Sequence, residues 1–233
     1  MEIKTTDKKN IESMFMAGAH FGLGRSRRHP TVAPFIFGTK NTTDIFDLEK
    51  TSLVLEKVRN MIVALAKDGK TILFVGGKKE ASIAVKNAAM AINMPYVDGR
   101  WIGGTLSNFG QIRKRIDRYE KFVSDREKGE LAKYTKRERM LIDKEIASLE
   151  KMFYGIVFLK KVPDMIFVID PRREKNAVKE ATDMNVPVIA LAGSDCNISE
   201  VTYPIVGNDA SKASIQFFLD EVVKAYQSGK KAA

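Results

Sequence analysis

The chain has 233 residues, of which 44% are hydrophobic and 29% are charged, and this composition excludes an intrinsically disordered protein. Its formal net charge of +10 favours polyanionic partners, nucleic acid first and an anionic membrane surface second. Cys196 is the only cysteine, so an intrachain disulfide and a cysteine-rich metal site are excluded and a reducing compartment is indicated.

The first residues predict a polar start, followed by a short apolar helix over residues 11–17. They show neither a secretory signal nor an Arg-rich transit peptide. No run in the chain approaches the ~20 apolar residues that a membrane span needs. We therefore expect a cytoplasmic protein without a membrane partner.

A basic segment follows, with the sequence HFGLGRSRRHP over residues 20–30. We predict a loop, in which Arg25, Arg27 and Arg28 gather positive charge. The planar guanidinium group suits phosphate oxygens, so the loop is a candidate phosphate contact. Equally, its arginines could cover apolar surface in a solvated loop. His20 and His29 are the only histidines and have no metal-ligand spacing, so no metal site is predicted.

The rest of the chain alternates between strands and helices, which is typical of an α/β domain with a parallel sheet. Continuous apolar runs such as TILFV (71–75) indicate strands buried on both faces. We predict strands over 35–38, 43–47, 71–75, 95–97, 164–169, 187–191 and 203–206. We predict helices over 48–67, 83–91, 174–184 and 215–226. Asp170 and Pro171 are the predicted N-cap and first residue of the helix over 174–184. A frayed tail is predicted over 228–233.

Gly76, Gly77, Lys78 and Lys79 follow one of these strands and precede a helix, where an α/β protein can hold a phosphate. The segment lacks both the G-x-x-x-x-G-K-[ST] and the G-x-G-x-x-G patterns. A tight turn explains the glycines. A nucleotide or sugar-phosphate enzyme using this crevice is the alternative function.

The stretch RWIGGTLSNF, from Arg100 to Phe109, separates the α/β pattern from a long charged segment. Arg100 and Trp101 place a cation beside a large aromatic ring, and Thr105 or Ser107 could cap the helix that follows. The stretch is either a glycine-rich turn with a half-buried Trp or a contact for a partner.

Residues 108–154 predict a helical hairpin inserted between two parts of a core domain, 1–107 and 155–233. Its apolar residues repeat at alternating spacings of three and four, as in an antiparallel coiled coil. Some 20 residues per arm would project roughly 30 Å. The densest cations are Arg113, Lys114 and Arg115, with Arg118 one turn further on. They form either a solvated face or a surface for a partner.

A catalytic site is not evident. Asp170 is explained by capping, Asp195 by a turn, and Cys196 as a small buried hydrophobe. The sequence therefore predicts no enzyme, no cofactor and no small-molecule substrate.

Several segments together resemble the bacterial small-subunit ribosomal protein S2 family. They occur in the family's order and cover nearly the whole chain: GAHFG (18–22), PFIFG (34–38), DLEKT (47–51), ILFVGGKKEA (72–81), PYVDGRWIGGTLSNF (95–109), DPRRE (170–174) and YPIVGND (203–209). The chain departs from the family's usual pattern at Leu23–His29 and at Ser194–Ile198.

The resemblance implies a Rossmann-like parallel sheet with flanking helices and an inserted antiparallel coiled-coil hairpin. It implies a non-catalytic protein that binds small-subunit ribosomal RNA at the head–body junction and supports translation. Neighbouring small-subunit proteins are the implied partners, with ribosomal protein S1 in bacteria that have it. The RNA-facing residues that we predict on this basis are Arg25, Arg27, Arg28, Arg100, Trp101, Arg113, Lys114, Arg115 and Arg118.

Overall fold

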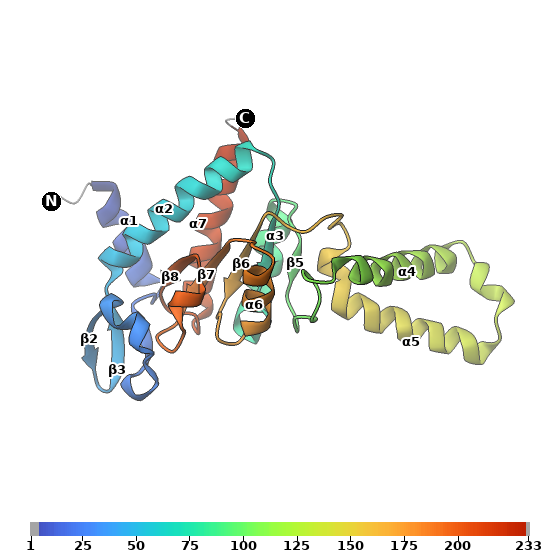
Figure 1. The fold of residues 1–233 in the computed structure, drawn as a ribbon, viewed down its shortest axis with the longest axis horizontal. Helices are drawn as coiled ribbons and strands as arrows, with labels where there is room; N and C mark the ends of the chain where they lie inside the picture. The colour runs from blue at the N-terminus through green and yellow to red at the C-terminus, as the bar shows by residue number, and fades with distance from the viewer. Residues whose placement is uncertain (1–4, 232–233) are drawn as a thin grey trace.

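A parallel sheet of five strands forms the centre of the protein, and the computed structural model describes residues 5–231 around it (Figure 1). The spatial order of the strands is β5-β4-β6-β7-β8, with β5 and β8 at the edges. All residues of β4, β6 and β7 are buried, which confirms the reading of their apolar runs. The strands are β4 (Ile72–Val75), β5 (Tyr96–Val97), β6 (Met165–Ile169), β7 (Val188–Ala192) and β8 (Tyr203–Val206).

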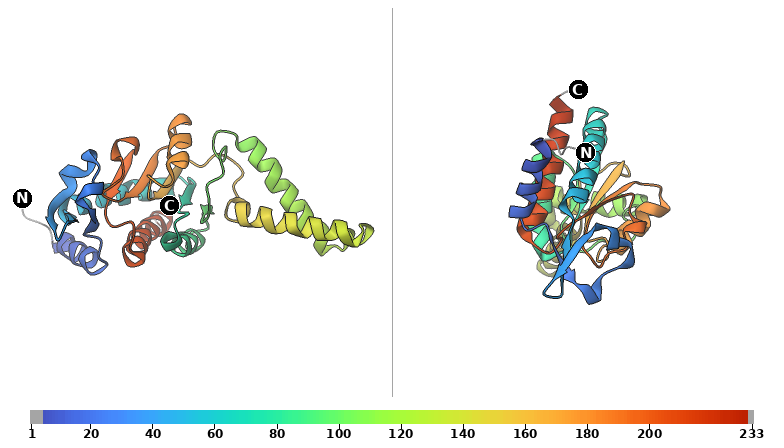
Figure 2. Two further views of the ribbon diagram at one scale, coloured as in Figure 1. Left: turned by 90° about the horizontal axis from the view of Figure 1, so that it is seen from below. Right: turned by 90° about the vertical axis from the view of Figure 1, so that its left-hand side faces the viewer.

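Helices cover both faces of this sheet (Figure 2). One core lies between the sheet and the helices α2 (Leu48–Lys67), α3 (Lys79–Ala91) and α7 (Lys212–Lys231), and α1 (Thr5–Met16) packs on α2. The second core lies on the opposite face, where α6 (Lys175–Asp183), Trp101 and the base of a helical hairpin pack against the sheet. The α/β fold predicted from the sequence is confirmed.

One predicted helix cap and one predicted helix end are wrong. Helix α6 begins at Lys175 because Asp170 has a φ of 61° and starts a separate turn, in which it accepts hydrogen bonds from Arg173, so it is not the N-cap. The tail expected to fray from residue 228 is helical as far as Lys231, because α7 packs against α2 up to Gly229. The last two residues of that predicted tail lie outside the described residues.

A smaller antiparallel sheet lies at one end of the molecule. It has the order β1-β3-β2 and consists of β1 (Phe21–Gly24), β2 (Ile36–Lys40) and β3 (Thr43–Phe46). The sequence predicts β2 and β3 but not β1, which was expected to be loop. This strand forms because Gly24 and Phe21 pair with β3 and the Leu23 N–H donates to Ser194 Oγ at 2.9 Å.

The helical hairpin consists of α4 (Phe109–Glu127) and α5 (Lys136–Phe153), and it projects from the opposite end (Figure 1). Helix α5 begins with a capping box at Thr135, in which the Glu138 carboxylate accepts a hydrogen bond from the Thr135 N–H at 2.9 Å. Asn108, rather than Thr105 or Ser107, is the N-cap of α4. The two helices are inclined to one another (Figures 1 and 2), and their coiled-coil packing stays a prediction.

Candidate nucleic-acid interface

The predicted RNA-facing residues form three groups spread along the long axis of the molecule (Figure 1). The basic segment that includes Arg25–Arg28 lies beside the small sheet at one end, and the cations of α4 lie on the hairpin at the other. Arg100 and Trp101 lie between them, where the hairpin joins the core. The fold therefore does not gather these residues into one pocket, and a partner that touches all of them has to be long.

Arg25 and Arg27 lie on a short 3-10 turn, Arg25–Arg27, that follows β1, and both side chains are exposed. Within residues 5–231 neither side chain forms an ion pair. Their guanidinium groups are thus available to phosphate oxygens.

Arg28 is held inside the fold instead. Its Nε donates to Asp44 Oδ2 at 2.7 Å, and its terminal nitrogen donates to Asp44 Oδ1 and Thr39 Oγ1. The Asp44 carboxylate is completely buried, so Arg28 neutralises a charge that water does not reach. Hydrogen bonding from Arg28 holds the pKa of Asp44 below its usual range. The position of Arg28 favours a structural role over an RNA contact.

Trp101 is only 5% exposed and belongs to the second core, which favours the core role over base stacking. Its indole Nε1 donates to Glu180 Oε1 of α6 at 3.1 Å. The neighbouring Arg100 side chain is exposed. Of these two predicted RNA-facing residues, Arg100 alone presents its side chain to solvent.

Glu180 organises the whole stretch around Trp101. Besides the indole, its carboxylate accepts hydrogen bonds from the N–H groups of Gly104 (2.8 Å), Leu106 (3.1 Å) and Ser107 (3.4 Å), and from Ser107 Oγ (3.4 Å). Burial raises the pKa of Glu180, but these hydrogen bonds outweigh it and the net pKa is lowered. Glu180 could not be predicted from the sequence as part of this stretch, because its partners lie more than 70 positions away.

Two of the predicted hairpin cations are also engaged internally. Arg113 donates to Asp117 Oδ1 (2.7 Å), to Glu120 and to the Val157 carbonyl (2.6 Å), which ties α4 to the chain that leaves α5. Arg118 pairs with Glu145 of α5 at 2.9 Å. Their charges are largely neutralised by these partners, whereas Lys114 and Arg115 are exposed and form no ion pair within the described chain.

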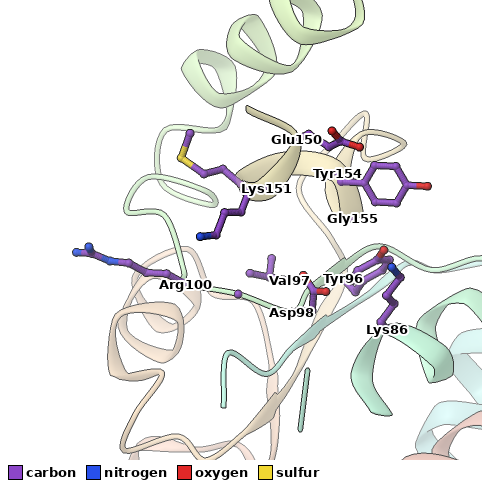
Figure 3. A pocket seen from close by; sticks show the side chains of 11 residues that line it. Lys86, Tyr96, Val97, Asp98, Arg100, Glu150, Lys151, Tyr154 and Gly155 are labelled. Carbon is purple, nitrogen blue, oxygen red and sulfur yellow. The ribbon is translucent and has the colours of Figure 1, made fainter. Parts of the chain in front are cut away.

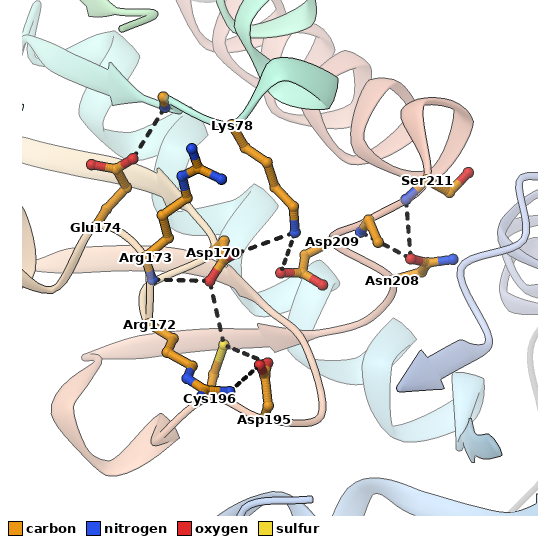
Figure 4. A network of polar contacts seen from close by, with 12 residues as sticks. Lys78, Asp170, Arg172, Arg173, Glu174, Asp195, Cys196, Asn208, Asp209 and Ser211 are labelled. Carbon is orange, nitrogen blue, oxygen red and sulfur yellow. Dashed lines mark hydrogen bonds and ion pairs between the residues drawn. The ribbon is translucent and has the colours of Figure 1, made fainter. Parts of the chain in front are cut away.

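The crevice at the carboxyl ends of β4 and β6 is the place where doubly wound proteins bind cofactors. Here it is filled by the chain itself (Figure 4). Lys78 Nζ pairs with Asp170 Oδ2 at 3.2 Å and with Asp209 Oδ2 at 3.3 Å. The Gly77 N–H, which would face a phosphate, donates to Glu174 Oε1 at 3.2 Å. These bonds argue against the alternative of a nucleotide-binding enzyme.

Cys196 lies in the same network and is completely buried, as predicted. Burial raises the pKa of its thiol to about 12, so it is a thiol and not a nucleophilic thiolate at neutral pH. Ligand atoms of Asp170, Cys196 and Asp209 lie within 4.8 Å of one another, but the Lys78 ammonium group already supplies the cation there.

Replacing Lys78 with Met is expected to lower the free energy of unfolding by about 2 kcal/mol at pH 8, because two carboxylates lose their cation. Burial raises the pKa of Asp209 to about 6, with Asp170 adding to the shift and Lys78 opposing it. Protonation of Asp209 thus favours the folded state below this pH, an effect lost as the pH rises through 6. The decrease in the free energy of unfolding caused by Lys78→Met should therefore be smaller at pH 5 than at pH 8.

Urea unfolding at both pH values measures this difference. The exposed neighbour Lys79→Met is the control and should change stability little at either pH. An equal loss at pH 5 and pH 8 would contradict the role given to Asp209.

The comparisons with known proteins agree on one family. Residues 14–229 match the family model described as ribosomal protein S2. The small ribosomal subunit protein uS2 of Sulfurimonas denitrificans is 39% identical over 220 residues, which cover 94% of this chain and 85% of the relative. The uS2 protein of Wolinella succinogenes is 38% identical over 223 residues, covering 96% and 82%. In residues 5–231, no helix has the length and apolar character needed to cross a membrane.

Proposed function

The chain belongs to the ribosomal protein S2 family, and we propose that it contacts small-subunit ribosomal RNA through exposed cations at both ends of an elongated molecule. It is a structural protein of the small ribosomal subunit and not an enzyme. Its place is in the assembled ribosome, among ribosomal RNA and other ribosomal proteins.

The observation that carries the proposal is the division between paired and unpaired cations. Lys114 and Arg115 on the hairpin, and Arg25 and Arg27 at the opposite end, are exposed and have no carboxylate partner within the described chain. Exposed cations without partners are the groups that release counterions on binding a phosphate backbone. We assign the RNA contacts to these four residues and to Arg100, with Arg113 and Arg118 shaping the hairpin that presents them.

The finer features follow from the family resemblance and the elongated shape. The proposal places the protein where the head of the small subunit meets its body, in the cytoplasm, next to other small-subunit proteins and to S1 where that protein occurs. It divides the chain into a core of residues 1–107 and 155–233 and a hairpin of residues 108–154. The hairpin gives the core a second, distant point of attachment.

Sedimentation of a cell lysate through a sucrose gradient tests the main proposal. The protein should travel with the small subunit and move to the top of the gradient after RNase treatment. A protein that stays near the position of a 26.1 kDa monomer in untreated lysate would contradict it.

Replacing both Lys114 and Arg115 with Ala should weaken binding to small subunits that lack this protein by roughly tenfold. The salt dependence of binding should also become less steep, by about 0.7 to 0.9 in the log–log slope per lost phosphate contact. Filter binding at several salt concentrations measures both. The matched control is Lys57→Ala with Lys67→Ala, two exposed cations of α2 outside the proposed interface. Equal losses in the two double variants would remove the assignment of the hairpin.

A further inference from the structure

A cavity of about 550 Å³ lies where the hairpin meets the edge of the five-stranded sheet. Its walls are the end of β5, the segment from Asp98 to Arg100, and the last turn of α5 with Tyr154 (Figure 3). The two walls approach closely because residue 155 is glycine. A Cβ atom there would lie 2.2 Å from the Tyr96 carbonyl oxygen. The cavity is thus a built feature of the joint between hairpin and core.

Charged side chains of both signs surround this cavity. The cations are Lys86, Arg100 and Lys151, and the acids are Asp98 and Glu150. Lys151 points across the gap between the two walls, while Arg100 extends outward at the rim (Figure 3). Within residues 5–231 none of the five takes part in an ion pair, whereas Arg113 and Arg118 nearby are paired. The cavity therefore offers separate sites for a negative group and for hydrogen-bond donors.

Tyr154 adds an aromatic surface. Its side chain is exposed although it is large and apolar, with 52% of the residue accessible to solvent. Lys86 Nζ lies 5.9 Å from the centre of its ring. An exposed ring beside a cation is the arrangement with which proteins stack and hold an unpaired base and its phosphate.

Tyr96 supplies a second, independent sign of a missing partner. The residue is only 6% exposed, and its hydroxyl oxygen is buried without a hydrogen-bond partner in the described structure. A buried hydroxyl without a hydrogen-bond partner destabilises the folded state by about 1 to 3 kcal/mol. Burial raises the pKa of this hydroxyl, so it stays protonated and can donate. Tyr96 lines the cavity, so a ligand group that reached this hydroxyl would satisfy it.

We propose that this cavity receives one unpaired nucleotide of the ribosomal RNA, an inference that rests on the proposed function. The base stacks on Tyr154, its phosphate lies between Lys86 and Lys151, and Arg100 holds the neighbouring phosphate at the rim. The Asp98 carboxylate accepts a hydrogen bond from an exocyclic amino group of the base. The Tyr96 hydroxyl bonds to the base edge or ribose.

The two carboxylates decide between RNA and an acidic protein segment. An acidic peptide would bring its own carboxylates against Asp98 and Glu150, and like charges at close range are repelled. A nucleotide meets the cations with its phosphate and the carboxylates with amino groups. Only the nucleotide matches both signs of charge together with the aromatic ring.

The test compares two double variants with matched geometry. Lys86→Ala with Tyr154→Ala removes the cation and ring of the cavity. Lys133→Ala with Tyr134→Ala removes a similar pair at the hairpin tip, where Lys133 Nζ lies 5.5 Å from the Tyr134 ring. Because Tyr154 and Tyr134 are both exposed, both variants should keep the melting temperature of the native protein.

Binding of each full-length variant to small subunits lacking this protein is measured, followed by chemical probing of the RNA bases. The cavity variant should bind about tenfold more weakly, and one or two neighbouring nucleotides should become reactive in it alone. Tyr154→Phe, which keeps the ring, should bind like the native protein. Ultraviolet cross-linking of native subunits should attach a nucleotide to the peptide that contains Tyr154.

The inference would be overturned if the native protein bound the subunit but the cavity variant bound with the same affinity, gave the same chemical reactivity of the RNA bases, and no nucleotide was cross-linked to the peptide that contains Tyr154. A cross-link from this peptide to another protein, in place of RNA, would overturn it in favour of a protein partner. Failure of the native protein to bind small subunits would instead overturn the proposed function on which the inference rests.

Discussion

Replacing Arg28 with Ala is expected to lower the free energy of unfolding, by more than the replacement of an exposed arginine such as Arg27 would. The reason is that the variant leaves the completely buried Asp44 carboxylate without its cation, while Thr39 Oγ1, at 3.0 Å, remains its single hydroxyl donor. The small sheet, which contains Asp44 in β3, should loosen first. Urea unfolding followed by circular dichroism measures the loss.

The control for this prediction is Arg27→Ala, one position away. Arg27 is exposed and forms no ion pair within residues 5–231, so its loss should leave stability nearly unchanged and weaken binding to the small subunit. The two neighbouring arginines should thus separate stability from binding. Similar effects of both variants on stability would contradict the division of this segment into structural and RNA-facing cations.

The Arg28 pair also predicts a dependence on pH. Arg28 lowers the pKa of Asp44 on folding from an ordinary value of 3.8. The contribution of the pair is therefore fully present above about pH 4 and is lost as the pH falls through the lower folded pKa. The difference in stability between the native protein and Arg28→Ala should shrink in acid.

Replacing Glu180 with Ala is expected to lower the free energy of unfolding by about 3 to 4 kcal/mol, because the carboxylate accepts five hydrogen bonds from the stretch around Trp101. The buried indole N–H loses its acceptor, and the turn at Gly104 loses the group that fixes it. Glu180→Gln should cost less, since the amide oxygen keeps part of the pattern. Stability by urea unfolding and the fluorescence of Trp101, the only tryptophan, report the change.

The matched control is Lys179→Ala, the exposed neighbour on α6, which should leave both readouts unchanged. Because the hydrogen bonds lower the pKa of Glu180, its contribution should persist at neutral pH and be lost in acid. Native fluorescence in the Glu180→Ala variant would show that the stretch is held by other contacts.

The sequence predicted the central sheet well because its strands are marked by local composition. The runs ILFV, MIFVI and VIALA are apolar throughout, and each is buried on both faces. The strand β1 was missed because FGLG has no such mark and is held by its neighbours. A segment that owes its conformation to distant partners carries little local signal.

The candidate site was harder to predict from local sequence than the strands were. Arg28, Arg113 and Lys114 look alike in the sequence as members of basic clusters. The fold pairs Arg28 with Asp44, 16 positions on. It ties Arg113 to Asp117 and Glu120 of the same helix and to the Val157 carbonyl, 44 positions on, whereas Lys114 stays free. Which cations remain available to a phosphate is decided by tertiary contacts, so composition identified the class of partner but could not rank the residues.

The insertion of the hairpin between neighbouring strands bears on how the chain folds during its own synthesis. Ile72 of β4 pairs with Met165 of β6, and the whole hairpin lies between them in sequence. One edge of β4 therefore stays open until the hairpin and β6 have been made. Because α4 and α5 are joined by a short connection, they can form locally and bring their distant ends together, which shortens the loop that the sheet must close. We therefore expect the element proposed to reach the RNA to help the central sheet to assemble as well.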